Sequence, residues 1–127
     1  MILEPDKILL EELVLRSSGD TSTDYWKNKL QAVQSLVRST ANMGDGKGEL
    51  ELGYLQYIPS YGLILIDPDK PNARCFVELY HHESAKFNPT FELSRSTDPE
   101  WFKFFKEQFD TMWSGCRMES FQSQNGN

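Results

Sequence analysis

Histidine and cysteine are scarce in this chain, with two of each among 127 residues. The histidines are adjacent, at His81 and His82, while Cys75 and Cys116 lie far apart in the sequence. This scarcity argues against most metal centres, and two cysteines are too few for a disulfide framework. Lone cysteines are more often buried small hydrophobic residues, so we expect free thiols, with a single disulfide as the alternative.

Long apolar runs are also missing. The longest comparable run is Leu63-Ile64-Leu65-Ile66, far short of the roughly 20 apolar residues that a membrane span needs. The first residues do not form an apolar signal segment. We therefore expect a cytoplasmic protein without membrane contact.

Positive charge is in the minority. Lys and Arg number 13 against 19 for Asp and Glu, which gives a net charge of −6. This balance opposes a sequence-independent hold on a phosphate backbone, so bulk nucleic acid is not an expected partner. The acidity is explained either by simple solubility or by a role such as imitating nucleic-acid charge, and both explanations stay open.

Large apolar side chains are present in sufficient number for one hydrophobic core. Hydrophobic residues make up 39% of the chain and aromatic residues 13%. A chain of 127 residues fits one domain, because typical domains hold about 100 to 150 residues. We predict a single domain over residues 1–117, followed by a polar C-terminal tail over residues 118–127.

Two segments have helical periodicity, and a strand end with a turn or two of helix is expected before them. Over 24–40, Trp26, Leu30, Val33 and Val37 fall on one face, and Thr23 or Asp24 is the expected cap. Over 98–114 the start is Asp98-Pro99-Glu100. There the Asp caps, the Pro takes the first helical position and the Glu favours the positive end of the helix dipole.

Strand patterns occupy the region between these helices. Residues 50–54 alternate as a strand with one buried face, and residues 61–67 are nearly all apolar, as in a strand buried on both faces. Turn chemistry then leads into a strand over 74–80, predicting a hairpin, and 90–94 is a shorter strand. The fold class is α/β, with α+β as the alternative: a mixed β-sheet of about 4–5 strands flanked by helices 24–40 and 98–114.

Candidate catalytic and metal-binding groups are few and poorly placed. Neighbours in a strand point to opposite faces, so the His-His-Glu trio at 81–83 is an awkward ligand set. The Asp-Pro-Asp segment at 67–69 is more often a simple turn than a cation site. The glycine-rich run at 44–48 follows a helix, which is the wrong order for a phosphate-binding loop. We predict no catalytic residue, no metal ligand and no cofactor.

A set of tyrosines and basic residues lies in the strand-rich half of the chain. Aromatic rings can stack on bases, and separated cations can bind phosphates. We therefore predict a ligand-binding site composed of Tyr57, Tyr61, Arg74, Tyr80 and Lys86. The alternative is that the tyrosines pack beside the sheet with their hydroxyls at the surface.

Several stretches together resemble the later half of phospholipase D-like domains. They are Gly48 to Tyr54, Ile58 to Asp67, Phe76 to Tyr80, Asn88 to Leu93 and the closing helix from Trp101 to Trp113. The chain is similar in particular to degenerate members attached to bacterial helix-turn-helix regulators and to signalling or antiviral-defence proteins. The opening Met1 to Asp6 resembles a turn found midway into such domains. This implies that a first strand and helix are missing or are supplied elsewhere.

The departure from this family concerns its nucleophile. Active members use a His-x-Lys motif, and no such motif occurs in this chain. The resemblance therefore implies the fold and a phosphate- or nucleotide-sized pocket without the catalytic histidine. We expect a non-catalytic ligand-sensing or regulatory domain that binds a nucleotide-type signal in prokaryotic signalling or antiviral defence. A protein partner or fused domain is also expected, and a homodimer is open.

Two other functions stay open at this point. The first is a small acidic inhibitor or interaction protein that blocks a partner's nucleic-acid or effector surface, where the acidic residues would do the binding. The second is a weak phosphoesterase that uses His81 or His82.

Overall fold

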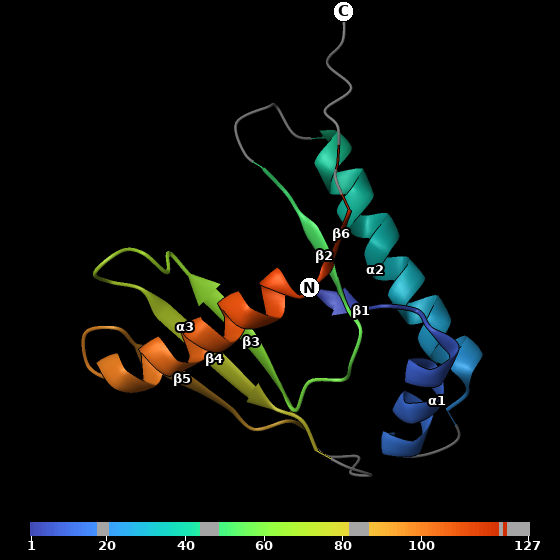
Figure 1. The fold of residues 1–127 in the computed structure, drawn as a ribbon, viewed down its shortest axis with the longest axis horizontal. Helices are drawn as coiled ribbons and strands as arrows, with labels where there is room; N and C mark the ends of the chain where they lie inside the picture. The colour runs from blue at the N-terminus through green and yellow to red at the C-terminus, as the bar shows by residue number, and fades with distance from the viewer. Residues whose placement is uncertain (18–20, 44–48, 82–86, 120, 122–127) are drawn as a thin grey trace, which may run out of the picture. The chain divides into compact units, whose positions relative to one another are not determined.

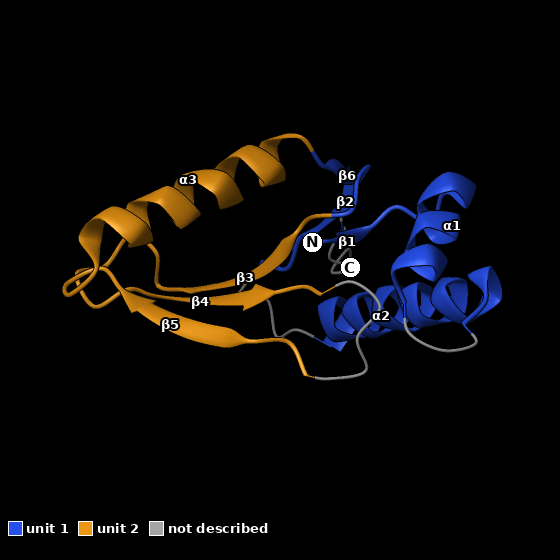
Figure 2. Cartoon of the chain, turned by 90° about the horizontal axis from the view of Figure 1, so that it is seen from below, with its two compact units in different colours: residues 1–58, 116–127 blue, residues 59–115 orange. Residues whose placement is uncertain are grey.

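The computed structural model describes residues 1–17, 21–43, 49–81, 87–119 and 121. The chain divides into two compact units: unit 1 holds residues 1–58 and 116–127, and unit 2 holds residues 59–115 (Figure 2). The described part contains three helices and two three-stranded sheets (Figure 1). The expected mixed α/β class is confirmed, with the strands in two sheets where one was predicted. Within this part, no helix combines the length and apolarity needed to cross a membrane.

Helix α1 (Lys7–Arg16) opens unit 1 and is longer than the one or two turns expected from the sequence. The Asp6 carboxylate accepts a hydrogen bond from the N–H of Ile8 at 2.9 Å, which stabilises the first turn. Leu9 and Leu10 are buried, and α1 packs against α2 (Thr23–Met43).

Helix α2 confirms the helix predicted over 24–40 and extends it at both ends. The Ser22 hydroxyl accepts a hydrogen bond from the N–H of Tyr25 at 3.2 Å. The cap is therefore Ser22, and the prediction of Thr23 or Asp24 was wrong by one or two residues. No α2 side chain is fully buried: Trp26 is only half-buried, and Val33 is 40% exposed.

The sheet of unit 1 is formed by β1 (Ile2–Leu3), β2 (Leu52–Leu55) and β6 (Arg117–Glu119). β2 lies at the centre, parallel to β1 and antiparallel to β6. All four residues of β2 are buried, whereas the sequence predicted a strand with one buried face. The strand β6 also takes the first two residues of the segment predicted to be a polar tail.

The sheet of unit 2 is formed by β3 (Tyr61–Ile66), β4 (Arg74–Leu79) and β5 (Thr90–Ser94), which are antiparallel neighbours in that order. Helix α3 (Pro99–Ser114) lies along one face of this sheet (Figure 2). The hairpin of β3 and β4 agrees with the prediction. Its register pairs Tyr61 with Leu79 at one end and Ile66 with Arg74 at the other.

Helix α3 and the face of the sheet beneath it enclose the core of unit 2. Cys75 and Val77 are fully buried there, together with Phe102 and Phe105 of the helix. The helix begins as predicted, but the Asp98 carboxylate does not cap it. That carboxylate accepts hydrogen bonds from the N–H of Ser94 at 3.2 Å and the hydroxyl of Thr97 at 2.8 Å, while Pro99 occupies the first turn.

The other face of this sheet is not covered by α3. Alternate residues of a strand point to opposite faces, and Ile64 and Ile66 point away from the helix. Ile64 is 64% exposed and Ile66 is 39% exposed. The prediction that this strand is buried on both faces was therefore wrong, because one helix covers only one side.

Candidate functional site

The face of the β3-β4-β5 sheet opposite α3, here called the open face, is built from three cross-strand rows. The rows are Gly62, Glu78 and Thr90; Ile64, Phe76 and Glu92; and Ile66, Arg74 and Ser94. The exposed Ile64 and the half-buried Phe76 are direct neighbours in the middle row. An apolar centre therefore lies among polar and charged side chains.

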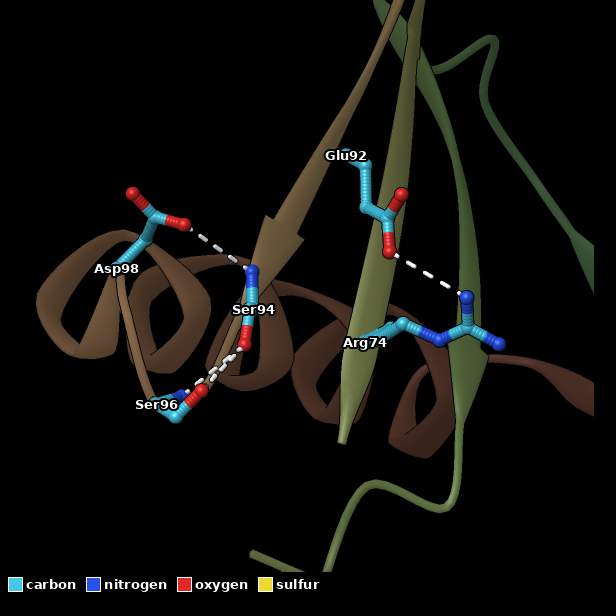
Figure 3. A network of polar contacts seen from close by, with 5 residues as sticks. All are labelled: Arg74, Glu92, Ser94, Ser96 and Asp98. Atoms are coloured by element: carbon cyan, nitrogen blue, oxygen red, sulfur yellow. Dashed lines mark hydrogen bonds and ion pairs between the residues drawn. The ribbon is translucent and has the colours of Figure 1, made fainter. Parts of the chain in front are cut away.

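Arg74 is one of the predicted site residues, and its guanidinium is already engaged on the open face. Its Nη1 lies 3.5 Å from Oε1 of Glu92, and its Cζ lies 5.9 Å from the centre of the Phe76 ring. Figure 3 shows Arg74 and Glu92 pointing toward each other across neighbouring strands. Such an exposed pair stabilises the fold by less than about 1 kcal/mol, so it mainly orients the two charges.

Tyr80, a second predicted site residue, follows β4 directly and lies over Gly62. Its hydroxyl is 2.6 Å from the position that a Cβ atom at residue 62 would take. Burial raises the pKa of Tyr80, and the Glu78 carboxylate raises it further. Glu78 in turn accepts a hydrogen bond from Nδ2 of Asn88 at 2.7 Å. At physiological pH Tyr80 is therefore a neutral phenol rather than a base.

Tyr61, a third predicted site residue, lies on the opposite face of the sheet. Its ring packs edge to face against Phe105, with centroids 5.5 Å apart, and its hydroxyl donates to Oε1 of Gln108 at 3.1 Å. Tyr61 therefore packs under α3, as the alternative reading of the tyrosines expected.

The predicted site residues within unit 2 are not gathered at one place. Arg74 and Tyr80 share the open face but stand six positions apart along β4, about 20 Å at about 3.4 Å per residue. Tyr57 belongs to unit 1 and is 49% exposed. Lys86 lies outside the described residues. The three predicted residues in the described part of unit 2, Tyr61, Arg74 and Tyr80, therefore do not line one pocket.

The groups considered for catalysis or metal binding are mostly engaged or protonated. No group of three or more His, Cys, Asp and Glu side chains suited to a metal ion occurs within the described part of the chain. Cys75 is a free thiol, and burial raises its pKa to about 11, so this thiol stays protonated. Asp67 and Asp69 lie 3.4 Å and 4.0 Å from the ammonium groups of Lys70 and Lys106.

Unit 1 contains a polar network that the sequence did not predict. The buried Tyr54 donates its hydroxyl hydrogen bond to Glu119. Arg38 of α2 donates two hydrogen bonds to the same carboxylate, from Nε at 2.7 Å and from Nη2 at 3.2 Å. Arg117 of β6 is the cross-strand partner of Tyr54. Its guanidinium carbon lies 4.1 Å from the centre of the Tyr54 ring, and two of its nitrogens donate to the Glu4 carboxylate at 2.7 and 2.8 Å.

This network ties α2 and the segment after β1 to the strands β2 and β6. The hydrogen bond from Arg38 lowers the pKa of Glu119, and the one from Tyr54 lowers it further. Burial raises the pKa of Tyr54, and the adjacent carboxylate adds to that effect. Both arginines are matched by a carboxylate, so the network suits a structural clamp better than an anion site. No local pattern could have found it, because the partners are distant in sequence.

Comparison with known proteins gives no counterpart: no family model, curated protein or solved structure matches the chain. Function must then be inferred from the described side chains. Of these, the open face combines exposed apolar area with ordered charges and offers the best candidate for a binding surface.

Proposed function

We propose that this chain is a non-catalytic regulatory domain of the cytoplasm that binds a protein partner on the open face of the β3-β4-β5 sheet. The observation that carries the proposal is the exposure of Ile64, at 64%, beside Phe76 in the middle of that face. Protein interfaces place apolar and aromatic side chains at their centre and polar groups at their rim. The open face has this arrangement.

The charged groups of the rim already have partners within the chain, which favours a protein over a small ligand. Arg74 pairs with Glu92, and Asn88 donates to Glu78. A nucleotide phosphate would have to compete with the Glu92 carboxylate for Arg74. An apolar partner surface requires no such exchange, because it covers Ile64 and Phe76 while the rim pairs stay intact.

The partner's chemistry follows from charge. The open face carries two carboxylates, on Glu78 and Glu92, against the single cation of Arg74. The whole chain has a net charge of −6. Complementary potentials steer association, so we expect a partner patch with an apolar centre and basic residues around it. This matches the interaction-protein alternative of the sequence analysis.

The protonation state of two side chains that could act as nucleophiles supports a non-catalytic role. Tyr80 and Cys75 both have raised pKa values, so each stays protonated near neutral pH. The resemblance to a degenerate phospholipase D-like domain stays a prediction, as does the nucleotide-type signal that it implies.

Site-specific photocrosslinking tests this proposal. A photoreactive phenylalanine analogue replaces Phe76 on the open face or, as a control, Phe104 of α3, which is 47% exposed. In cells that make the protein, we expect a discrete adduct with another protein from position 76 and a weaker or absent adduct from position 104. The protein found in the adduct is then produced on its own, and its binding to the purified chain is measured. No adduct from position 76, or equal adducts from both positions, would refute the proposal.

A further inference from the structure

At Leu63 and Leu65, the outer edge of β3 has no partner strand in the described part of the chain, since β3 ends the order β3-β4-β5. Ser60 continues the β3–β4 register by one pair, and its carbonyl accepts the N–H of Tyr80 at 3.1 Å. Along an antiparallel ladder, hydrogen-bonded pairs alternate with pairs whose backbone groups point away from each other. The N–H and C=O groups of Ile64 thus point toward β4, and those of Leu63 and Leu65 point outward.

β3 also lacks the features that usually protect an edge strand. Between Tyr61 and Ile66 it has no charged residue and no proline. The other edge strand, β5, carries Glu92 and follows Pro89 directly. Uncharged, apolar edges are templates for pairing with another chain. β3 is therefore the edge at which this sheet can be extended.

We propose that β3 pairs with β3 of a second copy of this chain, joining the two three-stranded sheets into one of six strands. Antiparallel pairing must match core-facing residues with core-facing residues. A two-fold axis at Ile64 meets this condition. It pairs Leu63 with Leu65 of the second copy, and Leu65 with Leu63, so that the outward backbone groups of both residues bond across the axis.

The side chains of β3 are complementary to themselves in this register. On the open face, Ile64 meets Ile64 of the second copy at the axis, where opposed Cα atoms are about 4.5 Å apart. Ile66 falls opposite Gly62 of the second copy, where a large side chain meets a residue without one. The exposed fractions of 64% and 39% at Ile64 and Ile66 both decrease.

The β3 edge carries no charge that a basic partner could recognise, so its chemistry suits a second copy better than the basic partner of the open face. No like charges oppose each other along β3, although each chain carries a net charge of −6. Overall repulsion between the copies is weakened by screening, so added salt should strengthen the dimer. Binding of the basic partner should instead weaken with salt. A two-fold contact uses the same β3 edge of both copies, so no β3 edge is left to bind a third copy.

A charge-swap experiment tests the pairing. We measure the molar mass of the full chain by light scattering across a dilution series, for the wild type, Ile64→Lys, Ile64→Glu, and the mixture of both variants. The wild type and the mixture should be dimers, because Lys and Glu face each other across the axis. Each variant alone should dissociate about tenfold or more readily, because like charges then oppose each other. Thr90→Lys, on the exposed β5 edge, is the control and should stay dimeric.

Amide hydrogen exchange locates the contact. In the dimer the N–H groups of Leu63 and Leu65 should exchange slowly, and in Ile64→Lys they should exchange fast. The N–H of Gly62 bonds toward β4, so it should stay protected in both and shows that the variant is folded. A monomeric wild type, variants that stay dimeric, a mixture that stays monomeric, or unprotected Leu63 and Leu65 amides would each overturn the proposal. An adduct from Phe76 with a second copy of this chain counts for the dimer, and only an adduct with a different protein counts for the partner, so the two proposals can fail separately.

Discussion

The hydroxyl of Tyr80 occupies the space that a side chain at Gly62 would need. A Cβ atom built on Gly62 would stand 2.6 Å from that oxygen and 3.2 Å from the ring carbon that bears it. Position 62 can therefore be only glycine while Tyr80 keeps this place. At this end of the open face, the Tyr80 ring covers β3 at Gly62, the position where β3 has no side chain.

Gly62→Ala should consequently destabilise the protein. Alanine in a strand normally gains stability over glycine, but the clash with Tyr80 should cost about 1–3 kcal/mol. In the double variant Gly62→Ala with Tyr80→Phe, the removed oxygen should restore part of this loss. Urea unfolding of the four proteins in the cycle gives the coupling energy. Equal or greater stability of Gly62→Ala would show that Tyr80 moves aside at little cost and does not restrict position 62.

Glu119 should make unit 1 acid-sensitive. Its pKa is lowered in the fold by the hydrogen bond from Arg38 and, to a smaller extent, by that from Tyr54. Its contribution to the free energy of unfolding is therefore complete above the ordinary carboxyl pKa of about 4.3. That contribution is lost as the pH falls through the lowered pKa. Melting temperatures from pH 7 down to about pH 3 should therefore drop less steeply in Glu119→Gln, which starts lower at neutral pH. Parallel curves for the two proteins would contradict the clamp.

Cys75 should be inert in the folded protein. It is fully buried, and burial raises its pKa to about 11, so little thiolate exists at pH 8 and reagent cannot reach it. In Cys116→Ser, which leaves Cys75 as the single cysteine, labelling by a disulfide reagent should follow the unfolding rate. Labelling as fast as that of a free thiol in solution would mean that the core of unit 2 is open.

Nucleotides should not stabilise the protein if the open face serves a protein partner. A ligand at 100 times its dissociation constant adds about 2.7 kcal/mol, which a thermal-shift assay detects as several degrees. We expect no such shift with mononucleotides or cyclic nucleotides. A shift that disappears in Arg74→Ala would instead support the nucleotide-type signal implied by the family resemblance.

Local patterns predicted the elements of this fold well. The segment Asp98-Pro99-Glu100 placed the start of α3 to within one residue, and the period of α2 was equally clear. Both signals act within a few positions of the chain. Details that depend on competing partners were missed: the Asp98 carboxylate binds the N–H of Ser94 rather than capping the helix, and Ser22 caps α2.

Long-range relations could not be predicted from one sequence. An apolar strand such as β3 looks the same whether helices cover one face or two, so the exposure of Ile64 was not foreseen. The separation of two predicted site residues has a similar reason, because alternation sends Tyr61 under α3 and leaves Arg74 on the other face. The partnership of Tyr54 with Glu119 needed a strand, β6, that the sequence assigned mostly to a polar tail.

The affinity of the Phe76→Ala variant for the protein captured at position 76 tests the central claim most directly. Titration calorimetry with the purified partner should show a loss of about tenfold or more, near 1.4 kcal/mol, because Phe76 lies at the centre of the proposed interface. Phe104→Ala removes an equal aromatic ring from α3 and should leave the dissociation constant unchanged. If Phe76→Ala binds as tightly as the wild type, the open face is not the binding surface.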